Sequence, residues 1–280
     1  MVRTVADEIA RAAGELRAAG IASPERDARW LMAACLGVER DRLTLFLKDP
    51  LSSETEFFYP HYIRDRLDRK PVSKILGQRE FWGRDFKITG DVLDPRPETE
   101  ILVKIALDGT FADVLDLGTG SGCILVTLLA ERPEAVGVGT DISDKALLVA
   151  GENAERLGVA DRLILPVSDW FADVGGRYGL IVSNPPYIAA AEMAALAPEV
   201  RDHEPRAALT DEADGLSAYR RIAAGAPDYL RPGGRLLVEI GPTQAAAVSA
   251  LFGGAGLEEI RVHPDLDGRD RVVAARAAGG

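Results

Sequence analysis

The sequence predicts an α/β fold, with helices covering a mostly parallel β-sheet and a small helical domain in front of it. From about residue 112, short apolar runs of strand length alternate with longer segments of helical character, as in parallel sheets. Residues 1–75 show helical periodicity and no such alternation. A chain of 280 residues exceeds the needs of one small domain and is long enough to bury a large core.

The first 75 residues are expected to form a helical bundle. Apolar residues recur at helical spacing from Ile9 to Ala19. Ser23 followed by Pro24 predicts the cap and first position of a second helix. Ser52 is expected to cap a third helix that runs to Arg69. The charged residues between positions 64 and 70 are interpreted as a solvated face of this helix. We assign no chemistry to this domain.

Residues 76–93 are predicted to link the two domains through a β-hairpin. Aromatic and polar residues alternate from Glu80 to Ile88 around the central Gly83. The proline-punctuated stretch 94–100 then reads as an extended joint before a helix at 101–107. The domain boundary is placed in this zone, and residues 94–280 form the second domain.

Seven strands are predicted in the second domain, and the last two are expected to run antiparallel to each other. Ser143 is expected to cap the helix that follows the second strand. The expected strands are 112–117, 135–140, 162–167, 179–182, 235–240, 257–262 and 271–275, and the helices are 123–130, 144–157, 213–230 and 243–252.

Composition argues against several classes of protein. No apolar run reaches the length of a membrane span, and acids occupy the place where a signal peptide has its apolar core. Cys35 and Cys123 lie far apart, which favours buried thiols in a reducing, cytoplasmic compartment. The net charge of −11 disfavours tight binding to duplex nucleic acid. Three scattered histidines make a metal centre unexpected.

The segment from residue 178 to Tyr187 predicts a binding corner. Its apolar run reads as the end of a buried strand, which Pro185 and Pro186 stop because proline has no backbone N–H. The carboxyl ends of strands in open α/β sheets are where ligands bind. The Asn184 side-chain oxygen and the Pro185 carbonyl would accept the N–H groups of a flat, conjugated NH2 group, with Tyr187 against its plane. The alternative is a plain strand-ending turn.

A glycine-rich turn follows the first predicted strand of the sheet and opens a helix. Glycines at 118, 120 and 122 let the backbone approach a ligand closely. Their spacing differs from the dinucleotide fingerprint, which wants glycine or alanine at position 123, where Cys123 stands. The turn consists of Gly118, Thr119, Gly120, Ser121 and Gly122.

Two further strand ends carry candidate residues. Asp141 follows the second strand, where an acid can hold both hydroxyls of a ribose. For this acid and the glycine turn together, the alternative is a tight strand–helix turn with a helix-capping Asp. Asp169 would reach an adenine amino group and Trp170 would cover the ring, although a tryptophan of the core or rim fits the pattern as well.

The motif D-L-G-T-G-S-G, followed by I-V-S-N-P-P-Y, resembles the class I S-adenosylmethionine (SAM) methyltransferases that act on planar amino groups. Residues 76–100, Glu199–Leu209 and the ending D-L-D-G-R-D-R-V-V resemble the release factor glutamine methyltransferases, the PrmC/HemK family. The helical first domain is similar too, so the resemblance spans nearly the whole chain. N-P-P-Y alone is shared with DNA adenine and rRNA guanine methyltransferases. Lys74 departs from the family, which often has an aromatic residue there.

The resemblance implies a Rossmann-like fold with a seven-stranded, mostly parallel sheet whose last strand is antiparallel. It implies methyl transfer from SAM to the side-chain amide nitrogen of the glutamine in the Gly-Gly-Gln loop of peptide chain release factors, which leaves S-adenosylhomocysteine. SAM contacts are implied at residues 118–122, Asp141, Trp170 and Asn184. Substrate contacts are implied at Asn184, Pro185, Pro186 and Tyr187, and Asn184, Pro185 and Tyr187 are the expected catalytic residues.

Other functions stay open at this stage. A methyltransferase acting on adenine N6 or guanine N2 of nucleic acids would need a basic face or a base-recognition domain. A non-catalytic SAM-binding protein would not need the Asn184 corner. An NAD oxidoreductase is disfavoured by the glycine spacing. The first domain is expected to grip the protein substrate, with no direct binding of nucleic acid or membrane. Glu98 and Glu100 fit a solvated loop or a place near the methionine end of SAM.

Overall fold

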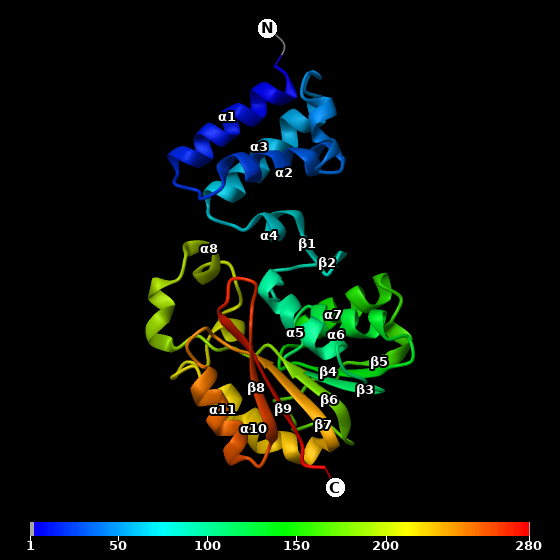
Figure 1. Cartoon of the computed structure of the whole chain (residues 1–280). Helices are drawn as coiled ribbons and strands as arrows, with labels where there is room; N and C mark the ends of the chain where they lie inside the picture. Colours follow the sequence, from blue (N-terminus) through cyan, green and yellow to red (C-terminus); the bar gives the residue numbers. More distant parts are fainter. Residues whose placement is uncertain (1–2, 280) are drawn as a thin grey trace. The chain divides into compact units, whose positions relative to one another are not determined.

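The computed structural model describes residues 3–279, which divide into two compact units (Figure 1). The first unit ends at Gln78 and also includes Ala197–His203. The second unit comprises Arg79–Leu196 and the chain from Glu204 onward. The polypeptide therefore passes between the units at 78/79, at 196/197 and at 203/204.

The first unit is helical, as predicted. Its core is a cluster of buried side chains that includes Leu16, Leu31, Met32, Tyr59 and Ile63. The hydroxyl of Tyr59 donates a hydrogen bond to the carbonyl of Ala28 (2.9 Å), so this buried polar group is satisfied. The helices are α1 (Val5–Ala18), α2 (Pro24–Leu36), α3 (Ser53–Leu67), α4 (Val72–Leu76) and α8 (Pro198–Arg201), with a 3₁₀ turn η1 (Arg42–Phe46).

One of the two predicted helix caps in this unit is confirmed. The Ser52 hydroxyl accepts the Thr55 N–H at 3.1 Å and caps α3. Ser23 precedes α2 but makes no such bond, because its backbone (φ −135°, ψ 60°) does not aim the side chain at the first turn. Pro24 does stand at the start of α2, as predicted.

The interpretation of the charges between residues 64 and 70 as a solvated face is wrong for Arg66. Its side chain is only 7% exposed and pairs with Asp27 (2.9 Å) and with Glu199 (3.1 Å). Arg69 also lies within 3.5 Å of Glu199. A guanidinium can serve several acceptors at once, which makes Arg suited to a buried ionic cluster. These ion pairs fix the segment 197–203 to the helices of the first unit.

The second unit is built on a seven-stranded sheet in the order β5-β4-β3-β6-β7-β9-β8. Strands β5, β4, β3, β6 and β7 pair in parallel, and β9 runs antiparallel to both of its neighbours. This confirms a mostly parallel sheet with an antiparallel last strand. The strands are β3 (Asp113–Leu117), β4 (Val136–Thr140), β5 (Leu163–Ile164), β6 (Tyr178–Ser183), β7 (Leu230–Glu239), β8 (Glu258–Pro264) and β9 (Asp270–Arg276).

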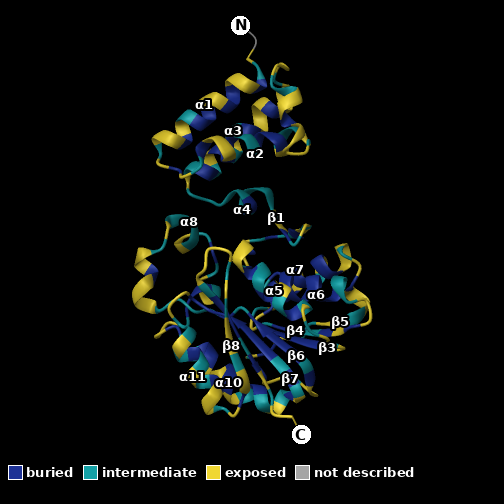
Figure 2. Cartoon of the chain, in the orientation of Figure 1, coloured by how far each residue is buried: buried dark blue, intermediate teal, exposed yellow. Residues whose placement is uncertain are grey.

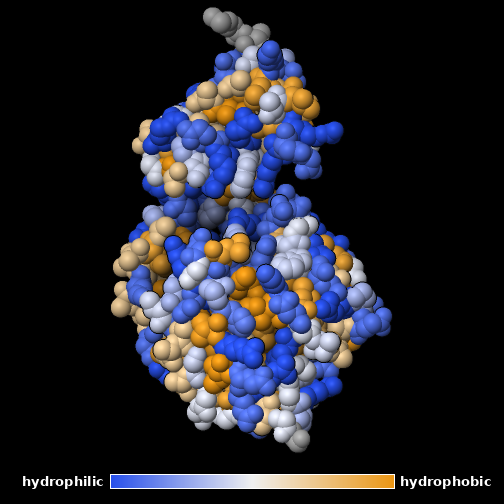
Figure 3. All heavy atoms as spheres, viewed as in Figure 1, coloured by the Kyte–Doolittle hydropathy of each residue, from blue (hydrophilic) through white to orange (hydrophobic). Residues whose placement is uncertain are grey.

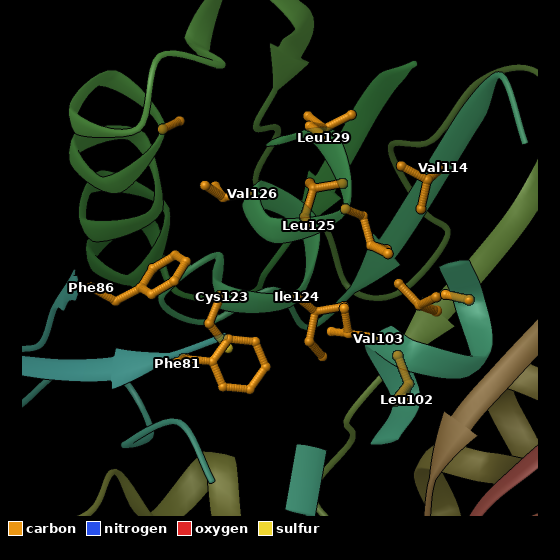
Figure 4. Close-up of a cluster of buried hydrophobic side chains, with 14 of the residues drawn as sticks. Phe81, Phe86, Leu102, Val103, Val114, Cys123, Ile124, Leu125, Val126 and Leu129 are labelled. Carbon is orange, nitrogen blue, oxygen red and sulfur yellow. The ribbon is translucent and has the colours of Figure 1, made fainter. Parts of the chain in front are cut away.

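Helices cover both faces of the sheet, and its central strands are almost wholly buried (Figure 2). On one face, side chains of α5 and α6 pack with the hairpin phenylalanines Phe81 and Phe86 in one cluster (Figure 4). On the other face, side chains of α10 and α11 form a second cluster. The helices are α5 (Glu100–Leu107), α6 (Cys123–Glu131), α7 (Asp144–Arg156), α9 (Arg206–Leu209), α10 (Ser217–Tyr229) and α11 (Ala245–Gly254).

The predicted hairpin is formed by β1 (Gln78–Phe81) and β2 (Arg84–Lys87). Trp82 and Gly83 make the turn, both with positive φ (53° and 67°), as tight hairpin turns require. The Glu100 carboxylate accepts the N–H of Trp82 at 2.8 Å. One of the two acids whose role the sequence left open therefore holds this turn.

Three predicted elements differ from the structure by more than two residues at one end. β5 covers only residues 163–164, because Pro166 cannot donate to the ladder. α10 starts at Ser217 rather than 213, since the Asp211 carboxylate binds the N–H groups of residues 213, 215 and 217 in a turn of its own. β7 begins at Leu230 rather than 235 and includes Gly233, which has φ +70°.

On the face of the second unit drawn in Figure 3, hydrophobic residues lie among hydrophilic ones. Single exposed apolar residues such as Leu148 and Leu266 are ordinary for a globular surface. Within residues 3–279, the structure contains no helix with the length and apolar character needed to cross a membrane.

Candidate active site

A cavity of about 750 Å³ opens in the second unit beyond the carboxyl ends of β3, β4 and β6. Its wall includes the glycine-rich turn, residues 141–143, residues 168–170, Asn184 and Pro186. Its volume lies in the range of about 300–1,000 Å³ that is typical of small-ligand pockets. The ends of three separate strands therefore border a single cavity at the edge of the sheet where the sequence predicts a binding site.

The glycine-rich turn faces this cavity through Gly118 and Gly120. Both have positive φ (72° and 56°), and a Cβ at either position would meet no atom within 4 Å. The turn is anchored from behind, because the N–H groups of Gly118 and Thr119 both donate to the Thr140 carbonyl at 2.8 Å. A ligand can therefore approach the backbone itself. Gly122 does not line the cavity; a Cβ there would lie 3.1 Å from the Ala150 Cβ.

Asp141 is held in one orientation on the wall. One carboxylate oxygen accepts the Gly120 N–H (3.0 Å), and the other accepts the Ser143 N–H (2.9 Å). Burial raises the pKa of this carboxyl above its ordinary value, against the effect of these hydrogen bonds. Each oxygen keeps a second acceptor position, so the pair suits two neighbouring hydroxyl groups of a ligand.

Ile142 lies next to this acid on the wall, and sequence reasoning missed it. Its side chain is 68% exposed in a place that lines a cavity. An exposed branched apolar side chain at this place provides an apolar surface against which the flat ring of a ligand can pack. Ile142 could have been identified from the sequence by its position directly after the acid that ends the strand.

Trp170 lies on the wall as well, with a φ of 58° that is unusual for a residue other than glycine. The Ser168 hydroxyl donates to its carbonyl at 3.0 Å and supports this conformation. Asp169, also on the wall, pairs with Arg221 at 2.7 Å. The carboxylate expected to reach an adenine amino group thus also has a partner at the surface.

The proline corner begins where β6 ends. The Ser183 hydroxyl donates to the Leu117 carbonyl (2.7 Å) and ties the corner to β3. The side-chain nitrogen of Asn184 donates to the Thr99 hydroxyl at 3.2 Å. Within residues 3–279, no group donates to the Asn184 side-chain oxygen, so this oxygen keeps its full acceptor capacity.

The other corner residues stand at different depths. Pro186 lines the cavity, whereas Pro185 is buried and does not. Tyr187 is also set back from the wall, and its carbonyl accepts a hydrogen bond from the Gln244 side chain at 2.9 Å. Burial raises the pKa of the Tyr187 hydroxyl to about 12, so the phenol is neutral near pH 7.

The charge of the wall favours a cationic ligand. Six acidic residues and two arginines line the cavity, and both arginines are paired with acids, Arg206 with Glu212 and Arg96 with Glu204. A wall of this kind repels the pyrophosphate of a dinucleotide. The acids are Asp91, Asp94, Asp141, Asp169, Asp211 and Glu212, and the arginines are Arg96 and Arg206.

Two wholly buried acids stand behind the site. Asp116, in β3, accepts a hydrogen bond from the Thr119 hydroxyl (2.7 Å), and burial raises its pKa to about 7. Glu239, at the end of β7, likewise has its pKa raised to about 7 by burial. Sequence reasoning gave neither a role, although an acid inside an apolar strand is a visible irregularity. In the described chain, no three His, Cys, Asp or Glu residues are grouped to hold a metal ion.

Comparison with known families gives two matches along the chain. A model of the PrmC N-terminal domain matches residues 8–77, and a model of the methyltransferase small domain matches residues 91–200. A release factor glutamine methyltransferase of Cereibacter sphaeroides is 59% identical over 97% of this chain and 98% of its own length. One from Rhodospirillum rubrum is 46% identical over 96% of this chain and 84% of its own length.

Among solved structures, a methyltransferase from Pyrococcus furiosus is similar in fold. The TM-score is 0.55, and the match covers 77% of this chain and 97% of the other. With 17% of residues identical, this likeness shows the fold alone.

Asp116 is expected to make stability fall as pH rises. Its pKa is raised from 3.8 to about 7, so the folded chain holds a proton that the unfolded chain has lost between these values. The stabilising contribution is full below about pH 4 and disappears towards pH 7, with a slope of at most about 1.4 kcal/mol per pH unit. Asp116→Asn cannot ionise and should remove this slope, measured as the free energy of unfolding in urea from pH 4 to pH 8. An identical pH profile in both proteins would contradict this assignment.

Proposed function

Because the chain belongs to the release factor glutamine methyltransferase family, we propose that it methylates the side-chain amide nitrogen (N5) of the glutamine in the Gly-Gly-Gln loop of peptide chain release factors. SAM is the methyl donor of this methyltransferase fold. The observation that carries the proposal is the juxtaposition of Asn184, whose side-chain oxygen is free to accept, with a ligand cavity at the same sheet edge.

The residues of the cavity suit SAM. The open glycine turn would admit the ligand against the backbone, and Asp141 would accept the two ribose hydroxyls. Ile142 and Trp170 would cover the adenine ring. The acidic wall favours the sulfonium and ammonium charges, which distinguishes SAM from an anionic dinucleotide. When bound, SAM supplies an electrophilic methyl group.

The chain itself contributes orientation and electrostatics. An amide nitrogen is a weak nucleophile because its lone pair is delocalised. The Asn184 side-chain oxygen and the Pro185 carbonyl would each accept one of its N–H groups, which directs the nitrogen towards the cavity. The same two acceptors stabilise the positive charge that the nitrogen acquires during attack. The surplus proton leaves to water afterwards, so no basic residue is needed before attack.

The helical unit supports recognition of the protein substrate. On α3, Phe57 and Phe58 are 62% and 45% exposed, with ring centroids 5.0 Å apart in an edge-to-face arrangement. Exposed aromatic side chains of this kind often anchor protein–protein contacts. We therefore assign this aromatic pair to contact with the release factor, outside the reacting glutamine.

Mass spectrometry of a release factor incubated with SAM and the protein tests the reaction. We expect one added methyl group on the glutamine of its Gly-Gly-Gln loop.

Asn184→Ala should lower kcat by about a hundredfold or more while SAM affinity changes little, because the amide nitrogen is no longer oriented and the residues that line the cavity remain. Methylation elsewhere on the substrate, or equal losses of turnover and SAM affinity, would refute the proposed role.

Asp141→Ala is expected to weaken SAM binding by about tenfold or more, since two charge-assisted hydrogen bonds to the ribose are lost. Isothermal titration with SAM measures this. Asp228→Ala is the control, because it removes an exposed acid of α10 that does not line the cavity. An unchanged affinity in Asp141→Ala would refute the ribose assignment.

Phe57→Ser is expected to raise KM for the release factor by about tenfold, with kcat and SAM affinity unchanged, because the aromatic anchor is lost outside the reacting centre. Leu148→Ser removes a similarly exposed apolar side chain from α7 and serves as the control. An unaltered KM in Phe57→Ser would place the contact elsewhere.

A further inference from the structure

Gln244 uses both ends of its side-chain amide to join three segments of the second unit. Its nitrogen donates to the carbonyls of Tyr187 (2.9 Å) and Gly215 (3.1 Å). Its oxygen accepts the N–H of Gly241 at 3.0 Å and the hydroxyl of Tyr219 at 3.3 Å. This one residue, directly before α11, therefore connects the chain after the proline corner, the loop before α10 and the turn after β7.

The chemistry of its partners requires a glutamine at this position. The carbonyls of Tyr187 and Gly215 can only accept hydrogen bonds, and the N–H of Gly241 can only donate one. An amide turned the other way round would place its oxygen against two carbonyl oxygens and its NH2 group against an N–H. A glutamate has the same shape but no proton to donate when ionised, so it cannot serve the two carbonyls.

The loop before α10 passes very close to the proline corner at Gly215. This glycine has a φ of +76°, and a Cβ there would lie 2.4 Å from the Tyr187 carbonyl oxygen and 3.2 Å from the Ala189 nitrogen. The loop is itself held by Asp211, which lines the cavity and accepts the Gly215 N–H at 2.9 Å. Hydrogen bonds therefore connect the cavity wall to the corner through Gly215 and Gln244.

The proline corner is thus anchored on both sides. Before it, the Ser183 hydroxyl is bonded to β3, and after it, Gln244 holds the Tyr187 carbonyl. Between these anchors, the proline rings fix φ at Pro185 and Pro186, and a residue that precedes a proline is restricted in ψ as well. Few dihedral angles are left free, so the position of the Tyr187 carbonyl determines the direction of the Pro185 carbonyl.

We propose that Gln244 is a positioning residue for methyl transfer, which fixes the direction of the Pro185 carbonyl by holding the chain after the corner. This inference rests on the proposed function, in which the Asn184 oxygen and the Pro185 carbonyl accept the N–H groups of the glutamine amide. Gln244 does not line the cavity and acts through the backbone of Tyr187.

Gln244→Glu and Gln244→Met test the proposal at pH 8, where a glutamate is ionised. Glutamate keeps the shape and the acceptor but loses both donors, and methionine loses all four hydrogen bonds. We expect each variant to lower kcat for the release factor about tenfold or more, with the SAM dissociation constant within about twofold of wild type, because Asp211 still holds the loop at the cavity wall.

Tyr178→Phe is the control for these variants. The Tyr178 hydroxyl donates to the carbonyl of Gly175 at 2.9 Å, at the start of β6 and away from the corner. Its removal deletes another hydrogen bond from a side chain to a carbonyl in the same unit and should leave kcat unchanged.

Gly215→Ala tests the close approach while leaving Gln244 intact. The added Cβ collides with the Tyr187 carbonyl, so the corner has to shift, and kcat should fall about tenfold or more. Gly233→Ala is the matched control, because Gly233 has a similar φ of +70° but a Cβ there meets no atom within 4 Å. The proposal is overturned if Gln244→Glu keeps wild-type kcat, if Gly215→Ala and Gly233→Ala turn over equally fast, or if kcat and SAM affinity fall in proportion.

Hydrogen exchange measured by mass spectrometry, without release factor, separates this proposal from the proposed function. The N–H groups of Ile188 and Ala190 donate to carbonyls of the segment 209–213. Gln244→Glu should speed exchange at these two amides about tenfold or more, and Tyr178→Phe should not. If exchange responds but the wild type methylates no release factor, the proposed function fails and the anchoring of the corner stands. If the wild type methylates and neither exchange nor kcat responds to Gln244→Glu, the positioning role fails alone.

Discussion

The register of three parallel strands is the constraint on which the site depends. Leu117 in β3 pairs with Thr140 in β4 on one side and with Ser183 in β6 on the other. The next residues along these strands, Gly118, Asp141 and Asn184, therefore leave the sheet at the same level. A slip of one residue in either pairing would turn the side chains of that strand to the opposite face. The distance between the glycine-rich turn and the proline corner is thus set by backbone hydrogen bonds rather than by flexible loops.

The same edge concentrates groups that do not favour folding. Asp116 and Glu239 are wholly buried carboxyls with pKa values raised by burial. Trp170, on the wall of the cavity, has a positive φ. Sites of this kind are tolerated because the two hydrophobic clusters on either side of the sheet supply stability elsewhere. Rigid packing also keeps the polar groups from relaxing, so that they meet a ligand already arranged.

Much of the fold and of the site could be predicted from local sequence patterns. Strand ends, the glycine turn and the hairpin follow from spacing and residue type within about ten residues, and the fold class followed from their alternation. Contacts between distant segments were out of reach: Arg66 meets Glu199, 133 positions away, and was interpreted as solvated. The depths of Pro185 and Tyr187 depend on the chain path after β6, which is held by a hydrogen bond from Gln244, the residue before α11. Thr99 gave no signal, since a threonine after Pro-Glu reads as a simple turn.

The short segment Ala197–His203 belongs to the helical unit although both of its flanks belong to the other one. Its acid, Glu199, is the ionic partner of Arg66 and Arg69. A cut at 78/79 would therefore leave a charged strip of the helical unit inside the remaining polypeptide, deprived of its counterions. The two units are therefore not two consecutive stretches of the chain that could be exchanged independently. Recombination with another helical module would have to replace two separated stretches of the gene together, which ties the inheritance of one unit to that of the other.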